Sequence, residues 1–469
     1  MTNVKTVRAD HDLEDERPTP PVALMVICIG YFLVILDATV VNVALPSMGR
    51  DLHGGTSDLQ WVVDAYTLTF AGLLLSGGAL AERLGGRRVF EAGLLLFALS
   101  SAVCGLSPTL GILIGARLVQ GLGAALLVPS SLVLLQAAYP TREGRSRAFG
   151  IWGAIAGIGA ATGPIIGGLL VSSWSWRGVF FINLPFALAA LVLAGRFVPV
   201  TRRRARALDL SGQLLAIAGL GLLTGALVEA GRLGWASPLV LAGITLAVAS
   251  LLAFGVVERR SSDPMLPLSL FSHPSFRSGS SVGLLINLGL YGQLFVMSLY
   301  FQDVRGYSAL QTGLALLPEA GLLVVASALS GRIMARSGPR LPMLIGLVIG
   351  GAGLLGVATT GAHTSYVTLI APLAAAGFGM ALTMPAATAS VMEAAPGDRG
   401  GIASGVVNAA RQTGSVLGVA LLGTLVTGGT SFIAGLDVGL AIAAGAFLAG
   451  AVITFVGIDR HRSNATTSS

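Results

Sequence analysis

Five charged side chains lie well inside long apolar stretches of this sequence, away from the ends of those stretches. Asp37, Asp64 and Glu319 are the acids, and Arg117 and Arg411 are the bases. If these stretches cross a lipid bilayer, a charge at their centre costs about 3 kcal/mol, so such residues mark pairing or function. A buried carboxyl beside a cation can bind and release a proton as its surroundings change. Asp37 and Arg117 are the candidates for such a pair.

The composition identifies the class of protein that holds these residues. Of the 469 residues, 54% are hydrophobic, only 11% are charged, and 64 are glycine. A soluble chain carries about 25% charged residues, so this one could not cover a surface in water, and disorder would need high charge and low hydrophobicity. Apolar runs of about 20 residues recur along the chain and predict transmembrane helices rather than a barrel.

The rarer residues argue against several kinds of chemistry. The only lysine, Lys5, cannot complete the Gly-Lys-Ser/Thr sequence of a phosphate-binding loop. All five histidines fall outside the apolar runs, and the two cysteines, Cys28 and Cys104, lie within them as small hydrophobic residues. We therefore expect neither an enzyme nor a resident metal or cofactor.

Fourteen apolar runs are each long enough for a tilted helix across a bilayer. They cover residues 22–46, 59–81, 89–106, 109–136, 147–171, 179–198, 210–230, 237–257, 278–301, 310–331, 341–360, 365–392, 402–427 and 434–457. The predicted fold class is an all-α polytopic membrane protein.

The basic residues orient these helices. With a cytoplasmic N-terminus and alternating spans, cytoplasmic segments hold 23 of the 29 basic residues, and the outer loops hold only Arg50, Arg177, Arg232 and Arg305. This asymmetry follows the positive-inside rule. We expect a multi-pass protein of the cytoplasmic membrane with both termini in the cytoplasm. The Arg202–Arg206 run is then a topogenic signal, and no nucleic-acid partner is expected.

An internal repeat divides the chain. Residues 78–88 and 331–340 place glycine, arginine, glycine and arginine at matching offsets, each after the second span of a six-span block. Repeated halves are typical of secondary transporters, whose substrate site lies between the repeats. The predicted organisation is an N-terminal tail (1–21), a six-helix bundle (22–200), a linker with two extra helices (201–260), a second six-helix bundle (261–458) and a C-terminal tail (459–469).

Six motifs in a fixed order resemble those of the major facilitator superfamily, and within it the fourteen-span drug:proton antiporters. They are residues 36–46, 78–88, 117–124, 163–168, 176–185 and 408–414. One departure is Glu82, which stands where the family has an aspartate. The resemblance implies the major facilitator fold with helices arranged as 6+2+6. It also implies a proton-coupled exporter of amphipathic drugs or antibiotics that confers resistance, driven by the proton gradient.

The resemblance also assigns two mechanical elements. A conformational latch at a helix end would be formed by Gly78, Glu82, Arg83, Gly85 and Arg87. An antiporter hinge would be formed by Gly163, Pro164, Gly167 and Gly168. Small residues at four-residue spacing let helices approach closely and a proline bends a helix, so simple close packing would use the same hinge residues.

The remaining candidate residues are those that would exchange protons or bind the transported substrate. We predict that Asp37 exchanges protons and that Arg117 tunes the pKa of Asp37. We also predict that Asp64 and Glu319 attract a cationic or polar drug. Further substrate-binding candidates are Asn42, Tyr66, Gln120, Arg411 and Gln412. Neutral polar side chains serve equally well as contacts between helices, and aromatic residues such as Trp152 and Tyr291 could stack on flat drugs or anchor the protein at the membrane interface.

Two alternative functions stay open from the sequence. One is export of a native metabolite such as a siderophore, and the other is a transport-inactive membrane sensor on the same fold. The expected partners are a small-molecule drug or antibiotic, protons and the lipid bilayer, with the chain working as a monomer.

Overall fold

The computed structural model of this chain describes residues 21–139, 141–201, 209–261, 264, 266–359, 361, 363–395, 400–428 and 431–458. Within these ranges the secondary structure is helical and includes no strand. The predicted tails, 1–21 and 459–469, fall outside the described residues except for Pro21, and so does the Arg202–Arg206 run.

The N-terminal half contains six spans. Its helices are α1 (Pro21–Leu52), α2 (Thr56–Leu84), α3 (Gly86–Leu106), α4 (Leu110–Ala138), α5 (Arg142–Ser173), α6 (Gly178–Phe181) and α7 (Asn183–Phe197). α2 packs on α4, and α1 packs on α5 and α7. The sixth span is interrupted at Ile182, between α6 and α7. Pro185 lies just beyond this break and has no N–H to donate to the carbonyl of Phe181.

Two further helices form a hairpin across the seam between the halves. α8 (Leu210–Leu233) packs on α2 of one half and on α16 of the other, and α9 (Pro238–Arg260) packs on α8. The Gln213 side chain donates to the carbonyl of Gly72 in α2. The Thr424 hydroxyl of α16 donates to the carbonyl of Leu227 at 2.6 Å. The hairpin is therefore hydrogen-bonded to both halves.

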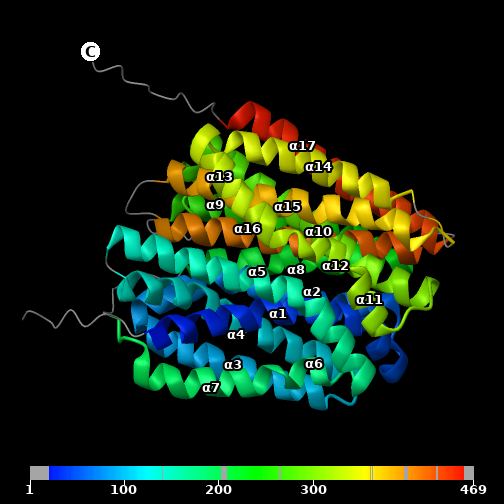
Figure 1. Ribbon diagram of the computed structural model, residues 1–469, viewed down its shortest axis with the longest axis horizontal. Coiled ribbons are helices and arrows are strands. Elements are labelled where there is room, and N and C mark those ends of the chain that lie inside the picture. The colour runs from blue at the N-terminus through cyan, green and yellow to red at the C-terminus, as the bar shows by residue number, and fades with distance from the viewer. Residues whose placement is uncertain are drawn as a thin grey trace, which may run out of the picture.

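The C-terminal half begins after a short 3₁₀ turn, η1 (Leu268–Ser272). Its helices are α10 (Pro274–Leu299), the π-helical turn η2 (Tyr300–Val304), α11 (Ala309–Ala315), α12 (Leu317–Gly321), α13 (Leu323–Ser337), α14 (Arg340–Val357), α15 (Tyr366–Ala394), α16 (Gly400–Gly428) and α17 (Phe432–Gly457). α10 packs on α16 and α17, and α14 packs on α15. In Figure 1 the blue-to-green helices α1–α7 lie together on one side and the yellow-to-red helices α14–α17 lie on the other.

Fourteen helical segments of the described residues are long and apolar enough to cross a membrane. The predicted fold class, with six spans, an added pair and six more, is confirmed. The tenth span, predicted over residues 310–331, is broken into α11, α12 and α13, and the part long and apolar enough to cross a membrane is Leu317–Ser337. Pro318 cannot donate to the carbonyl of Leu314, which weakens the helix at this point. Glu319 lies in α12, the shortest of the three pieces.

The two ends of the helix bundle differ. At the end where α2 meets α3 and α13 meets α14, which we call the arginine-rich face, lie Arg83, Arg87, Arg88, Arg332, Arg336 and Arg340. At the opposite face the halves share one apolar core, in which Val40 and Ala44 of α1 belong with Phe295 and Met297 of α10. The halves are thus packed together at the opposite face.

Glycines permit the closest helix contacts. Gly121 of α4 lies against α2, where a Cβ atom would fall on the carbonyl oxygen of Tyr66 and within 3.0 Å of the Thr69 Cβ. Gly115, on the same helix, has nothing within 4 Å of its Cβ position. Since backbone cannot move aside as a flexible side chain can, the α2–α4 contact depends on the glycine at position 121.

We expect Gly121→Ala to destabilise the protein by about 1–3 kcal/mol through overpacking. Gly115→Ala should leave stability equal or slightly improved, because alanine favours a helix by about 0.5–1 kcal/mol over glycine. Thermal unfolding of the purified variants in detergent measures both effects. Equal unfolding midpoints for the two variants would contradict this account of the α2–α4 contact.

Candidate functional site

A cavity of about 1870 Å³ lies between the two halves. Its walls come from α1, α2, α4 and α5 on one side and from α10, α12, α13, α15 and α16 on the other. Glu82, Arg145 and Arg259, at helix ends of the arginine-rich face, also line it. The cavity therefore opens at the arginine-rich face.

Hydrogen bonds between the halves close the opposite face. Gln302, at the end of the ninth span, donates to the carbonyl of Val43 in α1 at 2.9 Å. Gln60 of α2 donates to the carbonyl of Ala420 in α16, also at 2.9 Å. Both amide side chains are buried. Because a buried amide that loses its partner is destabilising, these bonds favour the conformation in which this face is shut.

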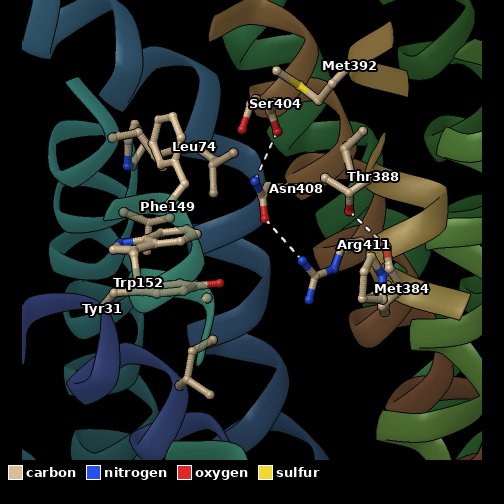
Figure 2. A pocket seen from close by; sticks show the side chains of 18 of the residues that line it. Tyr31, Leu74, Phe149, Trp152, Met384, Thr388, Met392, Ser404, Asn408 and Arg411 are labelled. Carbon is tan, nitrogen blue, oxygen red and sulfur yellow. Dashed lines mark hydrogen bonds between the residues drawn. The ribbon is translucent and has the colours of Figure 1, made fainter. Parts of the chain in front are cut away.

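An aromatic pair forms part of the cavity wall. The rings of Tyr31 in α1 and Trp152 in α5 stack with centroids 3.7 Å apart and an angle of 5° between their planes. The Trp152 indole N–H donates to the Ser131 hydroxyl at 3.1 Å, which fixes the indole ring. Figure 2 shows this pair on one side of the pocket, facing helices of the C-terminal half. A flat molecule can stack on such a rigid surface.

Arg411 faces this pair from α16. The guanidinium Nη1 lies 3.5 Å from the Asn408 side-chain oxygen, and Nε is buried with no acceptor. In Figure 2 both residues point into the pocket from the C-terminal half. Arg411 is close enough to the Tyr31 and Tyr291 phenols for electrostatic interaction. The middle of the cavity thus contains a cationic group with weak local hydrogen bonding.

Glu319 also lines the cavity. It is buried, and its Oε2 accepts a hydrogen bond from the Gln293 amide at 2.9 Å. Its backbone lies against Gly377 of α15, where a Cβ atom would fall on the Glu319 carbonyl. The broken tenth span thus places an acidic side chain in the wall of the cavity.

A second polar cluster lies inside the N-terminal half, away from the cavity lining. Asp37 of α1 forms an ion pair with Arg117 of α4, and both side chains are buried. The Asp37 Oδ1 accepts from Gln120 at 2.9 Å and from Asn183 of α7 at 3.0 Å. Three donors therefore converge on one carboxylate. Ser101 of α3 accepts further hydrogen bonds from the two amides.

Arg117 is held on its other sides as well. Its Nε donates to the Val62 carbonyl of α2 at 2.9 Å, and its Nη1 donates to Gln120 at 2.7 Å. The guanidinium carbon lies 4.2 Å from the ring centroid of Tyr66, a cation–π contact. Gln120 and Tyr66 were predicted as substrate contacts, and the structure places them in this cluster, outside the cavity lining.

Asp64 lies on α2, inside the N-terminal half. It is fully buried, and neither of its carboxyl oxygens has a hydrogen-bond partner in the described part of the chain. The residues that line the cavity do not include Asp64. This conformation therefore gives Asp64 no contact with a molecule in the cavity.

Helical phase explains this separation. Tyr31, Ile35 and Thr39 recur at four-residue intervals on α1 and line the cavity, whereas Asp37 lies about 160° around the helix from Ile35 and Thr39. The position of Asp37 within its apolar run indicates its depth in the membrane but not the direction of its side chain. Tyr31 was missed for the same reason, because its only signal was this spacing.

The predicted latch has its own contacts. Arg87 pairs with Glu91 at 2.8 Å and donates to the carbonyls of Gly195 and Val198 at the end of the sixth span. Gly85 adopts φ +97°, a conformation that favours glycine. Gly78 and Glu82 line the cavity, while the Arg83 side chain is exposed.

The predicted hinge residues lie where α5 crosses α1 and α11. A Cβ atom on Gly163 would fall on the Thr39 side chain, and one on Gly167 would lie 2.8 Å from the Val40 carbonyl oxygen. A Cβ on Gly168 would lie 2.6 Å from the Ala309 carbonyl oxygen of α11, and the Pro164 carbonyl lies against Gly313. The contacts of Pro164 and Gly168 with α11 join the two halves at the closed face, whereas those of Gly163 and Gly167 with α1 lie within the N-terminal half.

The two remaining predicted substrate-binding residues, Asn42 and Gln412, do not line the cavity. Asn42 donates to the Ala38 carbonyl of its own helix at 2.9 Å, and Gln412 is half-buried beside Arg411 without lining the cavity. Among the described residues, no three His, Cys, Asp or Glu side chains lie close enough to hold a metal ion.

Comparison with known proteins gives a family match over most of the chain. The family model described as Major Facilitator Superfamily matches residues 27–213, 203–419 and 324–468. The chain is 40% identical to the multidrug resistance protein Stp of Mycobacterium tuberculosis, over 85% of this chain and 74% of that protein. It is 37% identical to the methylenomycin A resistance protein of Streptomyces coelicolor, over 91% and 90% of the two chains. It is 40% identical to the puromycin resistance protein pur8 of Streptomyces alboniger, over 93% and 91%.

Solved structures share the fold at low sequence identity. A POT family transporter, in complex with a thioalcohol-conjugated peptide, superposes with a TM-score of 0.69 and 15% identity. The match covers 92% of this chain and 94% of that one. At this identity the likeness shows the fold alone.

The Asp37–Arg117 pair should behave as a coupled unit. We expect Arg117→Gln to lower the free energy of unfolding by about 3–5 kcal/mol, because it leaves Asp37 as a buried charge without a counter-ion. Adding Asp37→Asn to that variant should restore part of the loss. Thermal unfolding of the two single variants and the double variant in detergent measures this coupling, and strictly additive losses would contradict it.

Proposed function

This chain belongs to the Major Facilitator Superfamily, and we propose that it exports amphipathic drugs or antibiotics across the cytoplasmic membrane in exchange for protons. The observation that carries the proposal is the cavity of about 1870 Å³ between the two halves, open at one face and closed at the other. The resistance functions in the names of these relatives support the same direction of transport. The chain acts as a transporter rather than an enzyme.

The orientation follows from the charges. The arginine-rich face is the cytoplasmic one under the positive-inside rule, and α1 begins and α17 ends on that side. The cavity then faces the cytoplasm, where a drug enters it from the cell interior. Rocking of the halves would break the Gln302–Val43 and Gln60–Ala420 hydrogen bonds and release the drug outside.

The proton site is the Asp37 cluster. Asp37 and the cavity residues Tyr31 and Thr39 share one helix, α1, so a shift of α1 on substrate binding also moves the carboxylate relative to Arg117 and Asn183. A carboxylate that loses its donors takes up a proton, and one that regains them releases it. Export would then be coupled to proton entry through the movement of α1.

One chain provides all of the described lining of the cavity, which fits a monomer as the transporting unit. Asp37→Asn is expected to abolish proton-driven export while the protein still inserts in the membrane, because asparagine cannot exchange a proton. Drug susceptibility of expressing cells, with and without an uncoupler, measures this. Efflux at the wild-type rate by Asp37→Asn would refute the proposed proton site.

Two further variants serve as comparisons in the same cells. Asp64→Asn makes the same change at a buried acid away from the cavity, and Glu319→Gln changes an acid in the cavity wall. Loss of resistance to cationic drugs alone in Glu319→Gln would identify charge recognition by that residue. If the wild type confers resistance to no compound, the result favours one of the two alternative functions, export of a native metabolite or a transport-inactive membrane sensor.

The proposed orientation predicts which loops can be labelled from outside the cell. Ser237 lies between α8 and α9 at the opposite face, and Thr141 caps α5 at the arginine-rich face. Ser237→Cys should react with a membrane-impermeant maleimide in intact cells, and Thr141→Cys only after permeabilisation. The native Cys28 and Cys104 are buried, so a background from them is not expected. The reverse pattern of labelling would overturn the orientation.

A further inference from the structure

The cavity contains a cationic side chain whose charge no described carboxylate balances. Within the described part of the chain, the buried Nε of Arg411 has no acceptor, and its contact with Asn408 is at the 3.5 Å limit of a hydrogen bond. Its other polar neighbours are the phenols of Tyr31 and Tyr291, which carry no charge to balance it. Among the described residues no carboxylate forms an ion pair with it. The other intramembrane arginine, Arg117, has Asp37, Gln120 and the Val62 carbonyl as partners. Arg411 is therefore free to bind an anion from the cavity.

The surroundings of Arg411 specify more than charge. Across the pocket lies the stacked pair of Tyr31 and Trp152, with its indole fixed by Ser131. Met384 of α15 adds flexible apolar wall beside Arg411, and Met392 extends that wall about two helical turns farther along α15. Methionine adapts to ligands of different shape. A guanidinium beside a flat aromatic surface and an adaptable apolar wall suits a planar molecule with one anionic end.

The acidic groups of the cavity do not cancel this preference. Glu319 is hydrogen-bonded to Gln293 on the side of α10. Asp209 and Glu258 lie together at the cytoplasmic end of the α8–α9 hairpin, where Asp209 caps α8 through the Gly212 N–H at 2.8 Å. Glu82 lines the cavity at the end of α2 on the arginine-rich face. Among the described residues, none of these four carboxylates forms an ion pair with Arg411.

We propose that the substrate of this cavity is a planar aromatic or polycyclic molecule bearing a carboxylate, which pairs with Arg411 while its ring lies against Tyr31 and Trp152. This inference rests on the proposed function, since it takes the cavity to be the drug site. It differs from the cationic cargo expected from the sequence, because Asp64 is outside the cavity lining and Arg411 is within it.

Two probes that share a flat ring system and carry opposite charges test the proposal. Anthracene-9-carboxylate and 9-(aminomethyl)anthracene share one flat ring system, and their binding to the purified protein in detergent is measured by fluorescence polarisation. We expect the carboxylate to bind more tightly than the amine. Arg411→Gln should weaken carboxylate binding by about tenfold or more, and Arg411→Lys should restore much of it. Arg277→Gln, an exposed arginine outside the cavity, is the charge-matched control.

Each outcome of this binding experiment either supports or overturns the proposal. Equal or tighter binding of the amine by the wild type overturns the proposal, even if Arg411→Gln does not fold. Carboxylate binding that is lost equally in Arg277→Gln, or unchanged in Arg411→Gln, also overturns it, as does no carboxylate binding at all. Because binding is measured without a proton gradient, failure of proton-driven export leaves this result intact, and failure here leaves export open.

Discussion

The buried ion pair between Asp37 and Arg117 is the constraint on which the N-terminal half depends. Neither charge can stand alone in an apolar bundle, so the surrounding helices must bring their donors to one place. Gln120, Asn183 and the Val62 carbonyl complete the pair from α4, α7 and α2. This requirement fixes the rotation of five helices, since Ser101 of α3 joins the same network.

The rotation of α1 then determines what faces the cavity. With Asp37 turned inward to the bundle, Tyr31 and Thr39 must face the opposite half. The same helix approaches α5 so closely that only glycine fits at position 163. The buried Asp37 cluster proposed as the proton site, the aromatic wall of the cavity and the crossing with α5 thus share one helix, so none of them can move without the other two.

Much of this fold could be predicted from the sequence, because the bilayer imposes strong rules. Apolar length and the distribution of arginines predicted fourteen spans, and the scarcity of charge at depth singled out Asp37, Arg117 and Arg411. The direction of each side chain could not be predicted. A helix turns about 100° per residue, so an uncertainty of one or two residues in phase is enough to confuse Asp64 or Gln120 with a cavity residue. The break at Pro318 was also hidden, because transmembrane helices often accommodate proline.

The intramembrane arginines of the two halves differ in their ion-pair partners. Arg117 is neutralised within its own bundle, while Arg411 faces the cavity with Asn408 and two phenols beside it and, among the described residues, no carboxylate as an ion-pair partner. When the cavity is open to the cytoplasm, water can solvate Arg411. As the halves rock and the cavity narrows, that water is lost, and an unpaired guanidinium becomes costly. An anionic substrate removes this cost, so the loaded protein closes more readily than the empty one. The positive charge of Arg411 would thereby select the substrate and also favour the conformational change only when the substrate is bound.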